Sequence, residues 1–443
     1  MLRILMKPNK MLFAAAVTFT TIVSYAQQID TLKNERFSVH GQTTVITQYK
    51  PSFSAKYSGD NSLISKKENE RSLTATLLLG ARLWNGASIF MSPEIAGGSG
   101  LSTSLGVGAS TNGEAYRVDE AAPSFELGRF FLKQIIPLNK ECIYQSDDAD
   151  KLGGMIPTKY IALTVGKICV SDIFDVNRYS HDPRTQFMSW GLMNNGAWDF
   201  AANTKGYTPS FVVEWVTPQN ELRYGFSLLP KTPNGMKMDW KINNAGSHTL
   251  EYTHNYFIKG RKGALRLVSF LNKANMGNYR QSLALAPTSP NIASTEKEGR
   301  TKYGFGVNAE QEINDFMGMF FRASWNDGHN ETWAFTEIDR SISAGLSASG
   351  SKWNRKNDNV GLAYVVSGLS TPHRNYLEAG GKGFELGDGA LNYGLENLAE
   401  LYYSMELKNN LYVTGTYQFI VNPGYNKDRG PVNVLSIRIH AEF

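Results

Sequence analysis

The chain has 443 residues, of which 42% are hydrophobic and 12% aromatic, with 41 glycines and two cysteines. Beyond the first 30 positions it contains no run of 18 apolar residues, which excludes a helical membrane span there. Its formal net charge is +5, and it falls to +2 without residues 1–26, because that segment holds three basic residues and no acidic ones. The remaining charge balance does not support a nucleic-acid partner.

The first 26 residues have the pattern of a secretory signal peptide. Basic residues up to Lys10 precede an apolar stretch at 11–23, and the small-x-small motif SYA at 24–26 supplies a cleavage site. No cysteine follows that site, so the pattern is not that of a lipoprotein. We expect a signal peptide over residues 1–26 and one mature domain over 27–443.

After residue 35, about sixteen runs of roughly 9–14 residues alternate between apolar and polar side chains, the length that a tilted membrane strand needs. The alternation is clearest at 71–84, 399–407 and 411–419. The other runs lie near 36–48, 87–95, 124–136, 160–168, 209–216, 221–229, 249–259, 263–272, 301–311, 316–326, 333–348, 358–367 and 432–443. This period of two predicts strands with two different faces.

The links between these runs alternate in length. Short links lie at 84–86, 217–220, 259–263, 313–315 and 408–410, and long polar or glycine-rich links lie at 49–71, 96–123, 169–208, 230–248, 273–300 and 368–396. Outer-membrane barrels show this asymmetry, with short periplasmic turns and long outer loops. One link departs from it, since 137–159 should be a periplasmic turn but has about 23 residues.

Two hairpins fix a register. A three-residue loop WNG, with Gly86 in the left-handed region, predicts that Leu83 faces Ala87 and that Glu94 faces Thr76. A similar KNN loop predicts that Leu407 faces Leu411. In both hairpins apolar residues then face apolar residues, which a slip by one residue would undo.

The alternative of a soluble β-sandwich also predicts alternation, but sandwich strands average about 5–6 residues with short loops at both ends. Here the strands are longer, and aromatic residues such as Trp84 and Trp215 collect at their ends. A sheet edge in lipid is not tolerated, so the sheet must close. We therefore predict an all-β transmembrane antiparallel barrel of about sixteen strands with inward-folded outer loops.

The last run, VNVLSIRIHAEF, illustrates the two faces. Leu435, Ile437, Ile439 and Phe443 are expected to face lipid, whereas Arg438, His440 and Glu442 face the lumen. As the closing strand it should pair with the first run, near residues 37–48.

The sequence shows no GxSxG, HExxH, GxxxxGK[ST] or spaced Cys/His motif, which leaves only an enzyme built from distant residues. No catalytic, cofactor or resident-metal residues are predicted. Asp172, Asp175, Asn177 and Asp182 could form a loop Ca²⁺ site, although their spacing is not that of an EF-hand and a hydrogen-bonded loop explains them better. Whether Cys142 and Cys169 form a disulfide stays open.

The predicted lumen face carries both signs of charge, with acidic residues such as Glu94 and Glu214 among arginines such as Arg129 and Arg223. A pore for anions alone would be biased toward basic residues, and one for cations toward acidic ones. Mixed charges with aromatic rings suit a neutral, hydroxyl-rich solute. Glu94 lies about six residues, or roughly 20 Å, from its turn, so its charge must face the lumen. Arg82 lies near the periplasmic end.

The sequence resembles the carbohydrate-selective porins of the OprB type over most of the mature chain. The blocks that carry the resemblance are YSGDNSL (57–63), RLWNGASIFMSPEIAGGSGLS (82–102), VGKICVSDIFDVNRYSHDPRTQFM (165–188), YLEAGGKGFELGDGALNYGLE (376–396) and the segment 417–443. The resemblance implies a sixteen-stranded outer-membrane barrel through which sugars diffuse passively. It also implies a constriction of arginines with a glutamate, and the matching positions are Glu94, Arg82, Arg129, Arg178 and Arg184.

The predicted function is therefore passive diffusion of carbohydrates across the bacterial outer membrane. A porin for other small polar or anionic solutes is the first alternative, and an outer-membrane barrel enzyme is a second. The expected partners are outer-membrane lipid, small carbohydrates and, as the resemblance implies for the terminal Phe443, the outer-membrane assembly machinery. The chain could be a monomer or a homo-oligomer.

Overall fold

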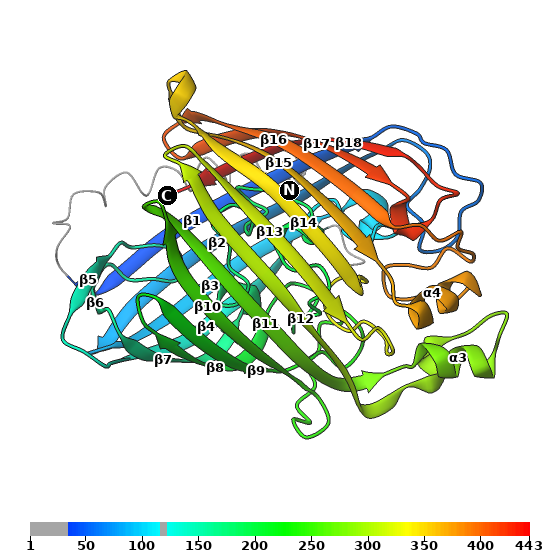
Figure 1. Cartoon of the computed structure of the whole chain (residues 1–443), viewed down its shortest axis with the longest axis horizontal. Coiled ribbons are helices and arrows are strands. Elements are labelled where there is room, and N and C mark those ends of the chain that lie inside the picture. The colour runs from blue at the N-terminus through cyan, green and yellow to red at the C-terminus, as the bar shows by residue number, and fades with distance from the viewer. Residues whose placement is uncertain (1–33, 116–121) are drawn as a thin grey trace, which may run out of the picture.

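The computed structural model describes residues 34–115 and 122–443, which form one closed antiparallel barrel (Figure 1). Its sixteen strands follow one another in chain order, with β7 directly beside β4, and they confirm the predicted fold class. The expected signal peptide lies outside the described residues. The barrel strands are β1 (Phe37–Lys50), β2 (Glu68–Trp84), β3 (Ala87–Gly98), β4 (Ser124–Pro137), β7 (Tyr160–Ile168), β8 (Thr208–Val216), β9 (Asn220–Ser227), β10 (Gly246–Ile258), β11 (Arg261–Met276), β12 (Lys297–Asn314), β13 (Met317–Asn326), β14 (Arg340–Gly350), β15 (Arg355–Gly368), β16 (Glu396–Lys408), β17 (Leu411–Val421) and β18 (Val432–Glu442).

The two faces of the strands are as different as the alternation predicts. On β18, Leu435, Ile437 and Ile439 are about half exposed on the outside of the barrel, whereas Arg438 and His440 are buried inside it. An outward apolar face and an inward polar face are what a strand between lipid and a polar lumen requires.

The barrel closes through β1 and β18. Their register runs from Gln42 opposite Glu442 to Tyr49 opposite Leu435, as the sequence predicts for the closing strand. Inside the barrel, Thr44 Oγ1 lies 2.8 Å from His440 Nδ1. The backbones of Gly41 and Phe443 exchange hydrogen bonds of 3.0 and 2.9 Å, and the Phe443 ring occupies the space where a side chain at Gly41 would lie. The seam therefore extends to the last residue.

Both predicted hairpin registers hold along the strands, including Thr76 opposite Glu94 and Met405 opposite Val413. At the turns themselves the prediction is wrong by one residue, because Ala87 faces Trp84 and Leu411 faces Lys408. The register shifts just before each loop, so one residue on the first strand is extra, as in a β-bulge. The bulge keeps the apolar side chains of Leu83 and Leu407 on the outside.

The two ends of the barrel differ. At the short-turn end, six turns of two to four residues join the strands, whereas long loops join them at the other end, where helices α3 (Tyr279–Leu285) and α4 (Thr371–Glu378) lie (Figure 1). The exceptional link 138–159 is at the short-turn end and contains a separate hairpin, β5 (Cys142–Gln145) and β6 (Gly154–Pro157). The run predicted as a strand from 333 starts only at Arg340, because residues 333–339 fold inward as a buried loop.

Several long loops fold into the lumen, as predicted. Short helices interrupt the long loops: η1 (Leu101–Ser104), η2 (Val170–Asp172), α2 (Trp190–Met193), η3 (Ile292–Thr295) and η5 (Pro423–Tyr425). Another short helix, η4 (Ser351–Trp353), lies in the turn between β14 and β15 at the short-turn end. Apolar loop residues such as Phe187 and Leu192 pack against inward residues such as Phe320, Val365 and Tyr402 from β13, β15 and β16. Loops therefore fill the side of the lumen next to these strands.

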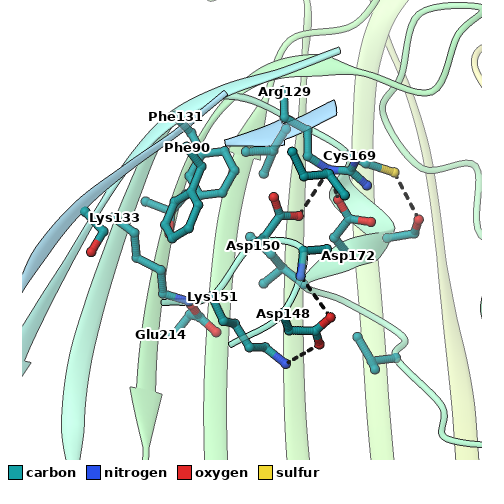
Figure 2. Close-up of a pocket in the computed structure, with 18 of the residues that line it drawn as sticks. Phe90, Arg129, Phe131, Lys133, Asp148, Asp150, Lys151, Cys169, Asp172 and Glu214 are labelled. Carbon is teal, nitrogen blue, oxygen red and sulfur yellow. Dashed lines mark hydrogen bonds and ion pairs between the residues drawn. The ribbon is translucent and has the colours of Figure 1, made fainter. Parts of the chain in front are cut away.

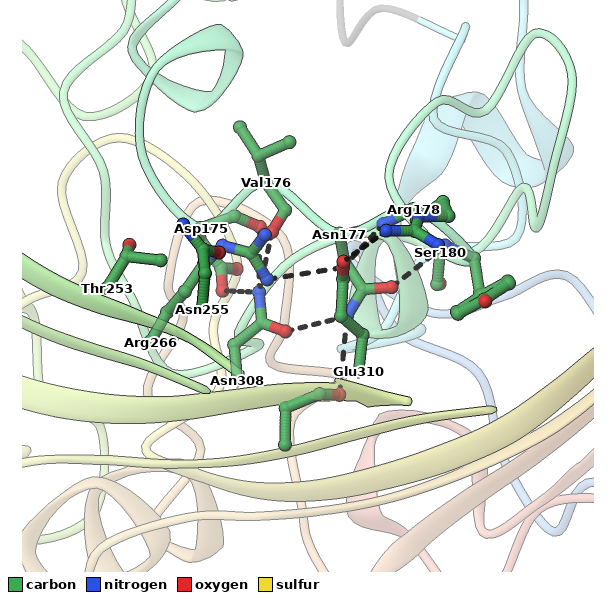
Figure 3. Close-up of polar contacts among 12 residues, drawn as sticks. Asp175, Val176, Asn177, Arg178, Ser180, Thr253, Asn255, Arg266, Asn308 and Glu310 are labelled. Atoms are coloured by element: carbon green, nitrogen blue, oxygen red, sulfur yellow. Dashed lines mark hydrogen bonds and ion pairs between the residues drawn. The ribbon is translucent and has the colours of Figure 1, made fainter. Parts of the chain in front are cut away.

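Buried polar contacts fix the loop 169–207 to the wall (Figure 3). Arg322 donates to the carbonyl oxygens of Leu192, Ser180 and Asp175 at 2.8, 2.7 and 3.1 Å, and the Asn308 side chain donates to the Asp175 carboxylate at 2.7 Å. These buried donors and acceptors thus find partners, which the loop needs if it is to stay inside the barrel.

The residues considered for Ca²⁺ all bind protein groups. Asp172 accepts from Arg129, Asp175 from Asn195 and Asn308, and Asp182 from the backbone of Arg184. Among residues 34–115 and 122–443, no cluster of three or more His, Cys, Asp and Glu side chains could hold a metal ion.

Cys142 and Cys169 are both free thiols, so the open question of a disulfide is answered in the negative. In the described part of the chain, no helix is both long enough and apolar enough to cross a membrane.

The anchor at Arg322 predicts how the channel changes when the loop is released. Arg322→Met removes the donor of the Leu192 and Ser180 carbonyl groups and the buried ion-pair partner of Asp175, and breaking a buried pair costs about 3–5 kcal/mol. We expect larger and noisier single-channel conductance in planar bilayers. Arg300→Met, which removes a surface contact to Gln281, is the control and should conduct like the parent. A quiet Arg322→Met channel of parental conductance would show that the loop is held by its other contacts alone.

Candidate functional site

The open part of the lumen is a cavity of about 1450 Å³. Its wall comes from the inward residues of β1–β4 and β7–β11, and its far side is formed by the loop 169–207. It extends from Asn85 and Gly86 at the short-turn end to Asn234 and Phe335 in the long loops. The cavity therefore follows one side of the barrel, and the packed loops occupy the other.

A β-bulge shapes the wall at its centre. Ser92 pairs with Arg129 and Pro93 with Leu127, so Gly128 is the extra residue of β4. Proline is tolerated inside a sheet at such a bulge. The bulge changes the parity of β4, so that Glu126 and Arg129 both reach polar groups inside the barrel although they are an odd number of residues apart. Simple alternation predicts only Arg129 on the inside.

Glu94, next to the bulge, is buried and acts as an anchor for other side chains. Its Oε2 accepts from Thr76 Oγ1 at 2.7 Å, from Tyr207 Oη at 3.1 Å and from Arg184 Nη2 at 3.2 Å. Arg184 also donates through Nε to Glu114 at 2.8 Å. Arg184 and Tyr207 line the cavity, whereas Glu94 lies behind them. Glu94 thus positions a guanidinium and a phenol at the cavity wall.

Tyr207 joins this cluster to Arg129. The Arg129 guanidinium carbon lies 5.5 Å from the Tyr207 ring centroid, and Lys167 Nζ lies 5.6 Å from it. Both distances are those of cation–π contacts. The ring fits because residue 128 is glycine: a Cβ there would lie 2.8 Å from the Tyr207 Cζ atom. The bulge residue therefore has a second role, which is to leave space for this ring.

Two carboxylates, carried by links at opposite ends of the barrel, contact Arg129 (Figure 2). Its Nε lies 2.7 Å from Asp172 Oδ2, on the loop that follows β7, and 3.2 Å from Asp150 Oδ2, in the link 138–159. Figure 2 also shows the Lys133 side chain extending to Glu214, with 3.0 Å between Nζ and Oε1.

Charge pairs continue around the wall beyond Lys133. Arg223 Nε lies 3.1 Å from Glu214 Oε2, and its Nη1 lies 3.0 Å from Glu251 Oε1. Basic and acidic groups therefore alternate from β4 across β8 and β9 to β10. This part of the wall therefore offers a solute hydrogen-bond donors and acceptors that alternate from strand to strand.

Aromatic rings complete the cavity lining. The ring centroids of Trp190 and Phe335 are 5.1 Å apart, and those of Phe200 and Phe335 are 4.2 Å apart. All three residues line the cavity from the inward-folded loops. The lining therefore combines flat apolar surfaces with charged hydrogen-bonding groups.

The structure separates the predicted site residues into two groups. Glu94, Arg184 and Arg129 meet around Tyr207. Arg82 lies at the short-turn end and donates to the carbonyl oxygens of Glu35 and Gly153, apart from that cluster.

Arg178 is half exposed and 3.8 Å from Glu310, outside the cavity lining.

Sequence reasoning missed Tyr207, Glu114, Asp150 and Asp172 as members of the cluster. The one available signal was Tyr207 itself, an aromatic residue two positions before the run predicted at 209–216.

A closed sixteen-stranded barrel with an apolar outer belt, long loops at one end and a polar cavity along its interior defines a porin of the bacterial outer membrane. The model of the carbohydrate-selective porin, OprB family, matches residues 70–443, and the chain belongs to that family. It is therefore a carbohydrate porin of the outer membrane, and family and fold together point to a channel rather than an enzyme.

Solved structures agree on the fold. The high-pH structure of Pseudomonas putida OprB has a TM-score of 0.70 at 17% sequence identity, and the match covers 92% of this chain and 94% of that one. The low-pH structure of the same protein has a TM-score of 0.50 at 13% identity, covering 92% and 93%. None of the curated proteins matches the sequence.

The cluster predicts the effect of removing the Arg184 charge. Arg184→Gln leaves the buried carboxylates of Glu94 and Glu114 without their guanidinium partner, so the cavity wall becomes more negative. We expect reversal potentials under a KCl gradient to shift toward K⁺. Arg178→Gln lies on the same loop but outside the cavity lining and should leave the potential unchanged. Equal shifts in both variants would contradict a specific role for Arg184.

Proposed function

We propose that the channel passes neutral mono- and oligosaccharides by passive diffusion along the side of the lumen that the loops leave open. The observation that carries this proposal is the cavity lining, in which nine acidic and nine basic side chains are interspersed with aromatic rings. A balanced wall does not concentrate ions of one sign. Its charged groups can exchange hydrogen bonds with hydroxyl groups, and the rings can cover the apolar faces of a sugar.

In this proposal Arg184, Tyr207 and Arg129 contact the solute, and Glu94 positions the first two. Guanidinium groups provide several donors in a fixed plane, which suits neighbouring hydroxyl groups. The rings of Trp190 and Phe335 provide the opposite kind of surface. A porin for anionic solutes is less well supported, because Arg129 and Arg184 are each paired with two carboxylates.

Liposome swelling with the purified protein tests the proposal. Vesicles with the porin should swell in isotonic glucose faster than in an anionic solute of the same size, such as gluconate. Swelling that is as fast with gluconate as with glucose would support the general-solute alternative. Absence of swelling and of salt conductance would contradict a channel altogether.

Glu94→Ala tests the arrangement of the cluster. The substitution removes the acceptor of Thr76, Tyr207 and Arg184, so the guanidinium and the phenol lose their fixed positions. We expect glucose-dependent swelling to change by about threefold or more, since each lost charge-assisted contact is worth about 1.5–3 kcal/mol. Glu298→Ala, at an exposed pair with Lys241, is the matched control. Unchanged sugar flux in Glu94→Ala would remove Glu94 from the site.

A further inference from the structure

The link between β4 and β7 is the exception at the short-turn end of the barrel, which is the periplasmic end of a porin. Its hairpin β5–β6 sits at this end (Figure 1), and the residues between the two strands, 146–153, enter the mouth of the cavity. We call residues 146–153 the inserted turn. A turn of two residues would connect two neighbouring strands equally well, so the extra chain is not needed to form the barrel.

Contacts on several sides hold the inserted turn in place. Gly153 N donates to Glu35 Oε2 at 2.9 Å, and Glu35 N donates to Gly153 O at 3.0 Å. Arg82 donates to the carbonyl oxygens of both residues. His40 Nε2 lies 2.8 Å from Asp147 Oδ2. The turn is thus fixed to β1 and β2 at the mouth.

The apolar side of the turn points into the barrel. Leu152 is 4% exposed and belongs to the same cluster as Phe90 and Phe131, two inward residues of β3 and β4. Burying a leucine side chain contributes roughly 1.5–3 kcal/mol, which opposes release of the turn from the lumen. Asp150 lies two residues before Leu152, so the anchored residues on either side of it hold its side chain in place.

Asp150 brings a carboxylate to the guanidinium of Arg129, 3.2 Å from its Nε (Figure 2). Arg129 is also a contact of Tyr207, so this carboxylate acts at the central cluster of the cavity. Asp148, in the same turn, instead faces Lys151 at 3.7 Å and has a side chain that is 65% exposed.

The turn also contributes to the charge balance of the cavity. Of the nine acidic side chains in the lining, Asp147, Asp148 and Asp150 belong to the inserted turn, and of the nine basic ones only Lys151 does. Without the turn, six acidic groups would face eight basic ones. One of those eight, Lys140, lies in the same link, so the barrel and its outer loops alone provide six acidic and seven basic side chains, and the inserted turn makes the lining more negative by two charges.

We propose that the inserted turn is the charge-selectivity element of this channel, and that Asp150, by pairing with Arg129, keeps the cavity from preferring anions. The inference rests on the proposed function to the extent that the chain must conduct small solutes. A purely mechanical tether would need the anchors at Glu35 and Arg82 but no carboxylate at position 150.

Reversal potentials in planar bilayers under a KCl gradient test the proposal. Asp150→Asn keeps the size of the side chain and an oxygen acceptor but removes the charge. We expect its Cl⁻/K⁺ permeability ratio to rise about tenfold, because removing one charge roughly 6 Å from the ion path in a water-like medium changes the permeability of each ion about threefold, in opposite directions. Asp148→Asn, an equal change at an exposed and screened position, should shift the ratio less than half as much.

Single-channel conductance in symmetrical salt and heat-modifiable migration on gels establish that each variant is folded and open. Replacing both Asp147 and Asp150 by Asn should raise the ratio further than Asp150→Asn alone. An unshifted ratio in a conducting Asp150→Asn channel overturns the inference, and so does an equal shift in Asp148→Asn. Absence of conductance in the parent protein contradicts the proposed function instead.

Acid provides a second readout. Burial raises the pKa of Asp150 to about 6, with the nearby Asp172 carboxylate adding to the rise and Arg129 opposing it; Lys133 of β4 and Asp148 of the turn also face it. A raised pKa means that the charge is present above about pH 6 and lost below it. Between pH 7.5 and pH 5 the parent should therefore become more permeable to Cl⁻, and Asp150→Asn should change less. If acid changed the Cl⁻ permeability of the parent and of Asp150→Asn equally, the titrating groups would be others and not Asp150.

Discussion

A backbone amide in the hydrocarbon core of a membrane must find its partner within the protein, and a sheet achieves this for all its strands only by closing. The seam between β1 and β18 meets this requirement here, with a continuous register from Gln42 opposite Glu442 to Tyr49 opposite Leu435. Closure fixes which face of every strand is outside. The polarity of each inward residue, and hence the chemistry of the lumen, depends on that one constraint.

Sixteen strands enclose more space than the inward side chains can fill. The loops occupy one side of that space, and many inward charges serve to hold them. Glu400 accepts hydrogen bonds from the backbone amides of Met188 and Ser189, and Glu396 from those of Gly108 and Ala109. Charges on the packed side are thus anchors for loop backbone, and those on the open side face the solute path. The inward position of a charged residue alone does not distinguish the two roles.

Two irregular features shape the open side. The bulge at Pro93 and Gly128 brings both Glu126 and Arg129 inward and makes room for the Tyr207 ring. The inserted turn approaches the same cluster from the periplasmic mouth and adds Asp150. Both features interrupt regular strand geometry, and both lie where the cavity meets its most highly charged wall. In barrels, β-bulges often lie next to a functional site, where they redirect a side chain.

The sequence by itself determined the barrel, its approximate strand number, the inner and outer faces, and the asymmetry of its two ends, because strand alternation and loop length are local properties. The hairpin registers were also predictable along the strands, and failed only at Leu83 and Leu407, where a bulge adds a residue. Glu94, Arg129 and Arg184 could be named from the family resemblance.

Only the tertiary structure decided which of these residues meet. Arg184 reaches Glu94 across 90 positions of sequence, and Asp150 reaches Arg129 from a link at the opposite end of the barrel from the loop that carries Arg184. Such contacts depend on how far each loop enters the lumen, which is set by the packing of side chains such as Leu152 and Phe187 on distant strands. A pattern of local alternation contains no information about that packing.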